Sequence, residues 1–142
     1  MSSRSEDSNQ RALEQAVYQW NRGSLPEYLR LYGADVILHG YAGIEPGIAS
    51  VRTYYEGWWQ AFPGSQIILK DVVSSGDRVA CRLVVEGTHA GPFRGLPASG
   101  RPVSVSGFTI LRFVDGQCVE RWSLVDSLTL LTQIGALAAT RQ

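Results

Sequence analysis

The most informative stretch of the sequence runs from Glu86 to Asp126 and reads EGTHAGPFRGLPASGRPVSVSGFTILRFVDGQCVERWSLVD. It holds the end of a predicted strand, a loop rich in glycine and proline, and two apolar runs separated by Asp115-Gly116. An Asp-Gly pair in that position is the strongest local signal for a two-residue hairpin turn. The pattern therefore predicts antiparallel strands over residues 102–114 and 117–126.

A two-residue turn also predicts how these strands pair. Phe113 stands opposite Cys118, and the same spacing gives the further pairs Leu111 with Glu120, Thr109 with Trp122, Gly107 with Leu124 and Val105 with Asp126. Because side chains alternate across a strand, all of these residues share one face of the predicted sheet. Asp126 then lies at the end of a largely apolar surface, where a carboxylate is costly unless it has partners or a function.

The length and net charge of the chain limit which classes of protein it can belong to. Its 142 residues make one domain by length, with residues 1–8 expected as a polar, disordered tail and 9–142 as the domain. Thirteen basic and thirteen acidic residues cancel, so neither nucleic acid nor an anionic membrane is expected as a partner. No apolar run approaches the roughly 20 residues that span a bilayer, and the N-terminus lacks a signal-peptide core. We therefore expect a cytoplasmic protein.

The cysteines and aromatic residues indicate which side chains fill the interior of the protein. Cys81 and Cys118 fall inside predicted strands without CxxC spacing, which is typical of small buried side chains rather than of a redox pair. Four Trp, six Tyr and four Phe fill a large core or line a pocket for a flat ligand, and composition does not separate the two.

The remaining patterns predict helices first and strands afterwards. Helices are expected over 9–22, from Ser24 to Tyr32 and over 48–62, and strands over 35–39, 66–73 and 78–89 in addition to the hairpin. A short C-terminal helix or edge segment follows around Leu128–Ile134. Three helices against one face of a curved, mostly antiparallel sheet make an α+β fold, a cone-shaped half-open barrel. Phe108 and Ile110 make the other face apolar as well, so we expect a second copy to cover it in a homodimer.

Seven short segments of this chain follow one another in a recognisable order: WNRGS at 20–24, DVILHG at 35–40, AFPGS at 61–65, SGDRVACR at 75–82, GTHAGPFRGLPASGRPV at 87–103, FVDGQCVERWSLVD at 113–126 and LLTQIG at 130–135. Together they resemble the SnoaL-like polyketide cyclases, a branch of the superfamily that shares the nuclear transport factor 2 fold. The resemblance covers nearly the whole chain. One departure is Ser99, which stands where the usual pattern has threonine and keeps the hydroxyl.

The resemblance implies a deep apolar cavity and a cofactor-free intramolecular aldol cyclisation of an aromatic polyketide ester, as in antibiotic biosynthesis. It also implies that Asp126 is the acid/base. Relatives of this fold include ketosteroid isomerases, epoxide hydrolases, hydroxylation components and non-catalytic binding domains, so those activities remain alternatives. Epoxide opening would need a second inward carboxylate, and Glu120 on the predicted face lies too far along the strand to serve.

Asp126 also suits aldol chemistry on physical grounds. Ring closure needs a base that removes a proton from a carbon between two carbonyls, and an acid that protonates the oxygen at the new bond. One carboxyl group whose pKa is raised by an apolar wall can do both in turn. The alternative is that Asp126 caps a C-terminal helix, because Ser127 and apolar residues follow it.

His39 and His89 are the only histidines, and each stands at the predicted end of a strand. A neutral imidazole there can hydrogen-bond a substrate carbonyl or orient Asp126. Side-chain alternation is expected to turn both inward, although a satisfied core or surface histidine is an equal alternative. The candidates for the substrate-binding wall are Tyr55, Trp59, Phe62 and Trp122, and at helical spacing such residues are often plain core.

Other chemistries lack their signatures. The two histidines have no i, i+4 spacing and the cysteines are far apart, so we expect no metal site. A Schiff-base aldolase needs a lysine, and the one lysine, Lys70, is predicted to face solvent. The glycine-rich loop 91–100 joins two strands and so is no phosphate cradle, and there is no Gly-x-Ser-x-Gly elbow.

Overall fold

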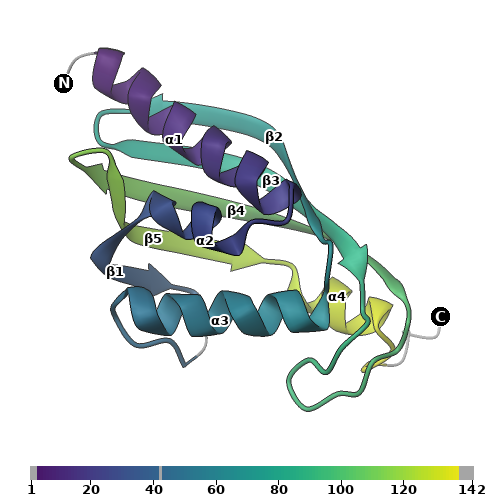
Figure 1. Cartoon of the computed structure of the whole chain (residues 1–142). Helices are drawn as coiled ribbons and strands as arrows, with labels where there is room; N and C mark the ends of the chain where they lie inside the picture. The colour runs from purple at the N-terminus through teal and green to yellow at the C-terminus, as the bar shows by residue number, and fades with distance from the viewer. Residues whose placement is uncertain (1–2, 42, 138–142) are drawn as a thin grey trace.

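The computed structural model describes residues 3–41 and 43–137. Its helices are α1 (Ser3–Asn21), α2 (Leu25–Tyr28), the short 3-10 helix η1 (Leu29–Leu31), α3 (Ile48–Ala61) and α4 (Ser127–Gln133). Its strands are β1 (Tyr32–His39), β2 (Gln66–Ser75), β3 (Arg78–Thr88), β4 (Pro102–Val114) and β5 (Gln117–Val125) (Figure 1). The predicted domain bounds of 1–8 and 9–142 stay a prediction, since residues 1–2, 42 and 138–142 lie outside the described residues.

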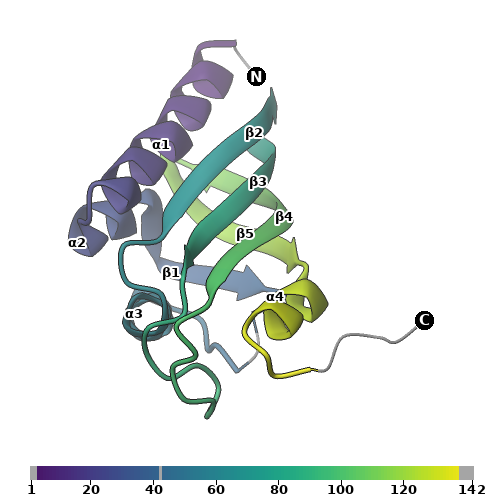
Figure 2. The ribbon, with the colours of Figure 1, turned by 90° about the vertical axis from the view of Figure 1, so that its right-hand side faces the viewer.

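The strands form one curved, unclosed sheet in the order β1-β5-β4-β3-β2. β1 runs parallel to β5, and all other neighbours are antiparallel. Figure 2 shows α1, α2 and α3 on one side of this sheet and α4 beyond the end of β5. The predicted α+β half-open barrel is confirmed. We call the helix-covered side of the sheet the inner face and the other side the outer face.

The first helix is longer than its apolar pattern predicted. Leu13, Ala16, Val17 and Trp20 are buried as expected, but α1 begins at Ser3, ahead of the predicted start at residue 9. The carboxylate of Glu6 accepts a 2.8 Å hydrogen bond from the backbone N–H of Gly76 in the β2–β3 turn. This contact holds the first turns of the helix against the sheet. Within the described residues, no helix is long and apolar enough to cross a membrane.

The hairpin turn is where the sequence placed it. Asp115 and Gly116 both have positive φ angles, 50° and 80°, as a type I′ turn requires. Phe113 lies opposite Cys118, as predicted. Beyond that pair the predicted register is wrong by one residue, because Val119 forms a β-bulge in β5. The observed pairs are Arg112 with Glu120, Leu111 with Arg121, Ile110 with Trp122, Thr109 with Ser123 and Gly107 with Val125.

The bulge exchanges the two faces of β5. One residue without a partner reverses the alternation of every side chain that follows. Arg121 therefore points to the inner face, with only 7% of its surface exposed, while Leu124 on the outer face is 77% exposed. The predicted inward positions of Glu120 and Trp122 are wrong for the same reason.

Two apolar clusters fill the space between helices and sheet. The larger packs α1, α2 and the middle of α3 onto the strands. The smaller lies at the far end of the sheet and consists of Ala61, Phe62, Val103, Val105, Leu130 and Ile134. We call this smaller group the distal cluster. Through Leu130 and Ile134 it holds α4 against the end of β4.

The outer face is apolar, and none of the described helices covers it (Figure 2). Its exposed apolar side chains include Val73, Phe108, Ile110 and Leu124, whose exposed fractions range from 41% to 77%. They lie beside Trp122 along an open groove of about 560 Å³. A second groove, of about 570 Å³, lies between Glu86 and Gln133 at the end of the sheet. Neither groove is lined by α1, α2 or α3, so the deep cavity between these helices and the sheet stays a prediction.

Candidate functional site

Asp126 directly follows β5 and is the N-cap residue of α4. Its Oδ1 accepts a 3.0 Å hydrogen bond from the backbone N–H of Thr129, and its Oδ2 accepts a 2.6 Å bond from the Thr129 hydroxyl. The hydrogen bonds from Thr129 lower the pKa of Asp126 below its usual value. The side chain is exposed. The structure thus places an exposed carboxylate at the end of the sheet, in the capping geometry that the sequence left as an alternative, and not on the inner face where the predicted strand pairing put it.

His89 follows the end of β3 and is buried, with 1% of its surface exposed. Its Nδ1 accepts a hydrogen bond of 3.2 Å from the backbone N–H of Ser99. Since an amide N–H can only donate, Nδ1 bears a lone pair and the neutral ring carries its hydrogen on Nε2. Nε2 is buried and has no partner among the described residues. The ring packs on Phe62 of the distal cluster, so His89 offers a free N–H near the end of the sheet where α4 begins.

His39 lies on the outer face, so the predicted inward position is wrong. Val36 and Leu38, near the end of β1, are buried, which leaves His39 on the opposite side. Its Nε2 lies 2.7 Å from Oε2 of Glu120, and its ring stacks on Trp122 at 5.3 Å. The structure therefore does not bring His39 together with His89 or Asp126.

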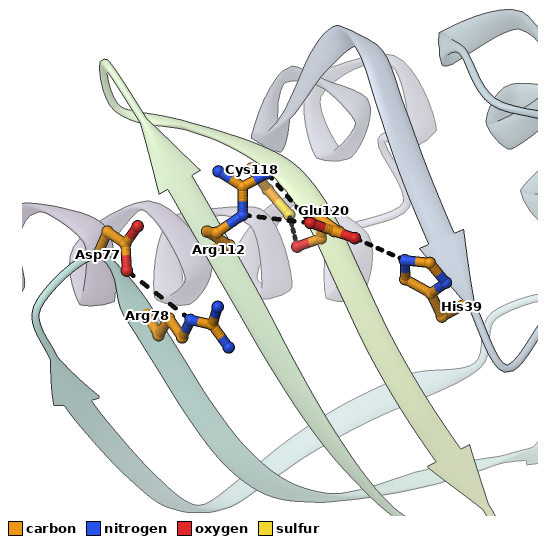
Figure 3. A network of polar contacts seen from close by, with 6 residues as sticks. All are labelled: His39, Asp77, Arg78, Arg112, Cys118 and Glu120. Carbon is orange, nitrogen blue, oxygen red and sulfur yellow. Dashed lines mark hydrogen bonds and ion pairs between the residues drawn. The ribbon is translucent and has the colours of Figure 1, made fainter.

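Glu120 is the centre of this outer network, which joins β1, β4 and β5 (Figure 3). Arg112 donates two hydrogen bonds to its Oε1, of 3.2 Å from Nε and 3.1 Å from Nη2. The hydrogen bond from His39 is the largest cause that lowers the pKa of Glu120, and Arg112 adds to it. These contacts order the side chains at one edge of the apolar outer face.

The predicted wall residues divide between the two faces. Tyr55 and Phe62 are buried inside, with exposed fractions of 7% and 0%. Trp59 is half-buried, and its ring packs edge-on against Trp20 at 5.2 Å. Its Nε1 has no hydrogen-bond partner among the described residues. Trp122 is on the outer face.

A buried cluster of polar side chains was missed by the sequence analysis. We call it the Arg121 cluster, and it consists of Arg121, Tyr28, Tyr32, Tyr55 and Thr109. The guanidinium donates to the hydroxyl of Thr109 from Nε at 2.9 Å, to Tyr32 from Nη1 at 2.6 Å and to Tyr28 from Nη1 at 3.2 Å. The Tyr32 hydroxyl also lies 2.7 Å from that of Tyr28 and 2.9 Å from that of Tyr55.

The charge of Arg121 has no acidic partner within the described residues. Their buried polar residues are Asn9, Ser65, His89, Thr109 and Arg121, and none of them is a carboxylate. Burial raises the pKa of Tyr28, Tyr32 and Tyr55, so the hydroxyls around the guanidinium stay neutral. Removing an isolated charge from water costs several kcal/mol in proteins. The chain tolerates that cost here with neutral oxygen ligands alone.

A chain of hydroxyl groups links this cluster to less buried residues. The Thr109 hydroxyl donates to the carbonyl of Trp122 at 2.9 Å and lies 2.8 Å from the hydroxyl of Ser123. Ser123 lies in turn 2.8 Å from the hydroxyl of Tyr41. Ser123 and Tyr41 are both half-buried. The polar inner wall therefore extends from the guanidinium toward solvent.

One signal for the tyrosines was present in the sequence. Leu25, Tyr28, Leu29 and Tyr32 follow the i, i+3, i+4, i+7 spacing of a buried helical face. Arg121 had no such signal, because the bulge at Val119 that turns it inward leaves no mark in the sequence. No group of three His, Cys, Asp or Glu residues in the described part of the chain is placed to hold a metal ion.

Known proteins resemble this chain along most of its length. The sequence model of the SnoaL-like polyketide cyclase family matches residues 10–134. No curated protein matched the sequence. Among solved structures, AclR from Streptomyces galilaeus, described as a candidate hydroxylase, is 30% identical with a TM-score of 0.85, covering 96% of this chain and 87% of AclR.

Two further solved structures agree with that match. TsrD from Streptomyces laurentii is 30% identical with a TM-score of 0.83, covering 92% of this chain and 97% of TsrD. IdmH from Streptomyces antibioticus, described as a candidate polyketide cyclase, is 29% identical with a TM-score of 0.75, covering 89% of this chain and 98% of IdmH. With its fold and with a family match from residue 10 to residue 134, the chain belongs to the SnoaL-like polyketide cyclase family.

Proposed function

We propose that this protein is a cofactor-independent polyketide cyclase that closes a ring by intramolecular aldol addition. One observation carries the proposal. The buried polar residues of the described chain offer N–H and O–H groups but no carboxylate, so the base has to come from a less buried position. Asp126 is the carboxylate at the N-terminus of α4, the helix whose Leu130 belongs to the distal cluster.

The proposed reaction begins when the Asp126 carboxylate takes a proton from a carbon between two carbonyl groups. The resulting enolate attacks a carbonyl carbon of the same molecule, and the new alkoxide oxygen takes the proton back from the Asp126 carboxyl group. The proton taken from carbon is returned to oxygen, so the substrate and the product have the same composition. The Nε2–H of His89 is free to donate to a substrate carbonyl, which is the helper role we assign to it.

The cap geometry of Asp126 affects its strength as a base. The Thr129 hydroxyl and backbone N–H stabilise the carboxylate and so weaken its attraction for a proton. A substrate that displaces the Thr129 hydroxyl from Oδ2 would remove the stronger of these contacts and place an apolar group beside the carboxylate. Both changes raise the pKa of a carboxyl group.

The inner aromatic residues Tyr55, Trp59 and Phe62 remain our candidates for the substrate-binding wall. They belong to α3 and to the residue that follows it, on the same side of the sheet as His89. His39 and Trp122 lie on the outer face, so any part they take in the site must be indirect. For both we propose a place at an interface between two copies of the chain.

We further propose that the outer face forms a homodimer. Its centre exposes the large apolar side chains Val73, Phe108, Ile110 and Leu124, and its edges carry both charge signs, with Asp71 and Arg82 on one side and Glu120 and Arg112 on the other. A two-fold axis through such a face can bring unlike charges together. The protein then acts in the cytoplasm as a dimer on a small apolar polyketide.

Hydroxylation is the second candidate function, and the similarity to AclR favours it. The two reactions differ in mass balance, because an aldol ring closure conserves mass and a hydroxylation adds one oxygen atom. Isomerisation, epoxide opening and non-catalytic binding have no observation of this kind in their favour. Mass spectrometry of the product from a linear aromatic polyketide ester therefore separates the two leading candidates.

The replacement Asp126→Asn tests the catalytic assignment. Asparagine caps a helix about as well as aspartate but cannot transfer the proton, so α4 should keep its cap while the rate of cyclisation falls about 10²- to 10⁴-fold. Asp115→Asn makes the same change in the hairpin turn, where asparagine is also favoured, and should leave the rate unchanged. Cyclisation at the wild-type rate by Asp126→Asn would contradict the proposal.

A further inference from the structure

The proposed proton transfer makes no use of the Arg121 cluster. This cluster holds a positive charge inside the protein, 7% exposed, and is surrounded by neutral hydroxyls. A purely structural arginine in such a place is normally paired with a carboxylate. The described residues supply no buried carboxylate. The hydrogen-bond donors and acceptors around the guanidinium therefore indicate what else this arginine could bind.

The guanidinium has hydrogens to spare. Arginine carries five N–H hydrogens. Arg121 uses three of them, one on Nε for Thr109 and two on Nη1 for Tyr28 and Tyr32. The hydrogens on Nη2 have no acceptor among the described residues.

The tyrosines supply no negative charge. The hydroxyls of Tyr28, Tyr32 and Tyr55 bond to one another, with contacts of 2.7 Å and 2.9 Å at Tyr32. Burial raises the pKa of all three, so they surround the guanidinium as neutral groups. The cluster thus has spare hydrogens on Nη2 and no anion.

We propose that the Arg121 cluster binds an anionic oxygen of a small-molecule ligand, in the class of carboxylates, phenolates and enolates. Such an oxygen has lone pairs and no hydrogen, so it accepts from the Nη2 hydrogens. Its charge also compensates the guanidinium. Hydrogen bonds between ionised partners of this kind are about twice as strong as neutral ones.

The ligand reaches the cluster from the side of Ser123 and Tyr41. These two half-buried residues continue the hydrogen-bonded chain that starts at Arg121 and Thr109. Tyr54, whose pKa burial raises to about 12, packs against Tyr41 at 5.2 Å and stays neutral as well. The approach is thus lined by neutral hydroxyls, which do not repel an anion.

For the natural ligand this inference rests on the proposed function, because the enolate of an aldol reaction is an anionic oxygen. Donors fixed in advance around such an oxygen lower the barrier to its formation. The binding itself is independent of the reaction. A binding test with unreactive probes can therefore fail while Asp126→Asn abolishes cyclisation. Equally, the probes can bind as expected while Asp126→Asn keeps its activity.

The test measures the equilibrium binding of 2-naphthoate and of its uncharged counterpart 2-naphthamide by calorimetry. Wild-type protein should bind 2-naphthoate at least about 10-fold more tightly. In Arg121→Met the preference should disappear, while Arg11→Met, the same change at an exposed position, should keep it. Equal affinities in the wild type, no binding of 2-naphthoate, or an unchanged preference in Arg121→Met would overturn the proposal.

A second measurement covers the case in which Arg121→Met does not fold. In wild-type protein labelled with ¹⁵N-arginine, the buried Nε–H of Arg121 exchanges slowly with water and gives its own resonance. Addition of 2-naphthoate should shift that resonance, and 2-naphthamide should not. No shift with 2-naphthoate, or the same shift with both probes, would count against an anion site at Arg121.

Discussion

The hydroxyl oxygen of Tyr32 accepts a 2.6 Å hydrogen bond from Nη1 of Arg121, in an interior where both residues are almost fully buried. Tyr32 starts β1 and Arg121 lies on β5, so this contact ties the edge strand to its neighbour from inside. It also gives the guanidinium one of the neutral oxygens that stand in for a carboxylate.

Tyr32→Phe should therefore destabilise the protein. The replacement keeps the ring and removes an acceptor from a buried charged donor, which costs about 1–3 kcal/mol of unfolding free energy. Urea denaturation measures this cost. Tyr18→Phe makes the same change at a side chain that is 60% exposed and should stay within about 0.5 kcal/mol of wild type. Equal effects of the two replacements would show that the buried contact contributes nothing.

The Thr129 hydroxyl should control the pKa of Asp126. In Thr129→Val the 2.6 Å bond to Oδ2 is lost and the backbone bond to Oδ1 remains, so the pKa of Asp126 should rise toward its usual value. Carbon-detected NMR titration of the carboxyl group gives that pKa directly. Thr132→Val is the control, because it removes a hydroxyl group of the same helix that donates to the carbonyl of Leu128. It should leave the pKa of Asp126 unchanged.

The same hydrogen bonds make stability depend on pH. Because the folded-state pKa of Asp126 is lowered, its contribution is present above the pKa of the unfolded chain and is lost as the pH falls through the folded value. The acid-side fall in melting temperature should be shallower in Asp126→Asn than in wild type, since asparagine does not titrate. Identical pH profiles for the two proteins would mean that the cap does not depend on the charge.

Deletion of Val119 should disrupt the fold. Without the bulge, β5 pairs with β4 in the register of a simple hairpin. Arg121 then points to the outer face and Trp122 to the inner face. We expect a loss of more than about 3 kcal/mol of unfolding free energy, beyond the range of most single changes. Deletion of Glu45 from the exposed loop before α3 is the control and should cost much less. Cooperative unfolding with wild-type stability after deletion of Val119 would contradict this account of the bulge.

The outer face should hold two copies together. Leu124→Arg puts a charge into its apolar centre and should weaken dimerisation at least about 10-fold in analytical ultracentrifugation. Tyr18→Arg places the same charge on an exposed apolar residue of α1 and should have no effect. A wild-type protein that sediments as a monomer at all concentrations would dismiss the proposed dimer.

Much of the fold could be predicted because local patterns and tertiary structure agree. The alternating burial of β4 follows its sequence from Val103 to Phe113, and the Asp115-Gly116 turn fixes where the hairpin reverses. The helices follow their apolar spacing in the same way. In each case a short stretch of sequence contains the whole signal.

The candidate site was harder to predict, because it depends on pairing between distant segments. An apolar valine inside a strand gives no sign that it is a bulge, so the faces of Arg121 and Trp122 were exchanged. His39 was expected to face inward with Ile37, but Ile37 itself belongs to the apolar outer face and is 39% exposed. A sheet that is apolar on both sides removes the contrast on which side-chain alternation relies.

The contact between Ser99 and His89 explains how this chain tolerates its one departure from the usual family pattern. A main-chain amide supplies one of the two contacts to Nδ1, at 3.2 Å, and every residue except proline has that amide. The hydroxyl at 2.9 Å is common to serine and threonine. The loop between β3 and β4 thus selects the tautomer of the buried His89 ring. A molecule that changes the conformation of this loop would shift the ring proton between Nε2 and Nδ1 without contacting His89.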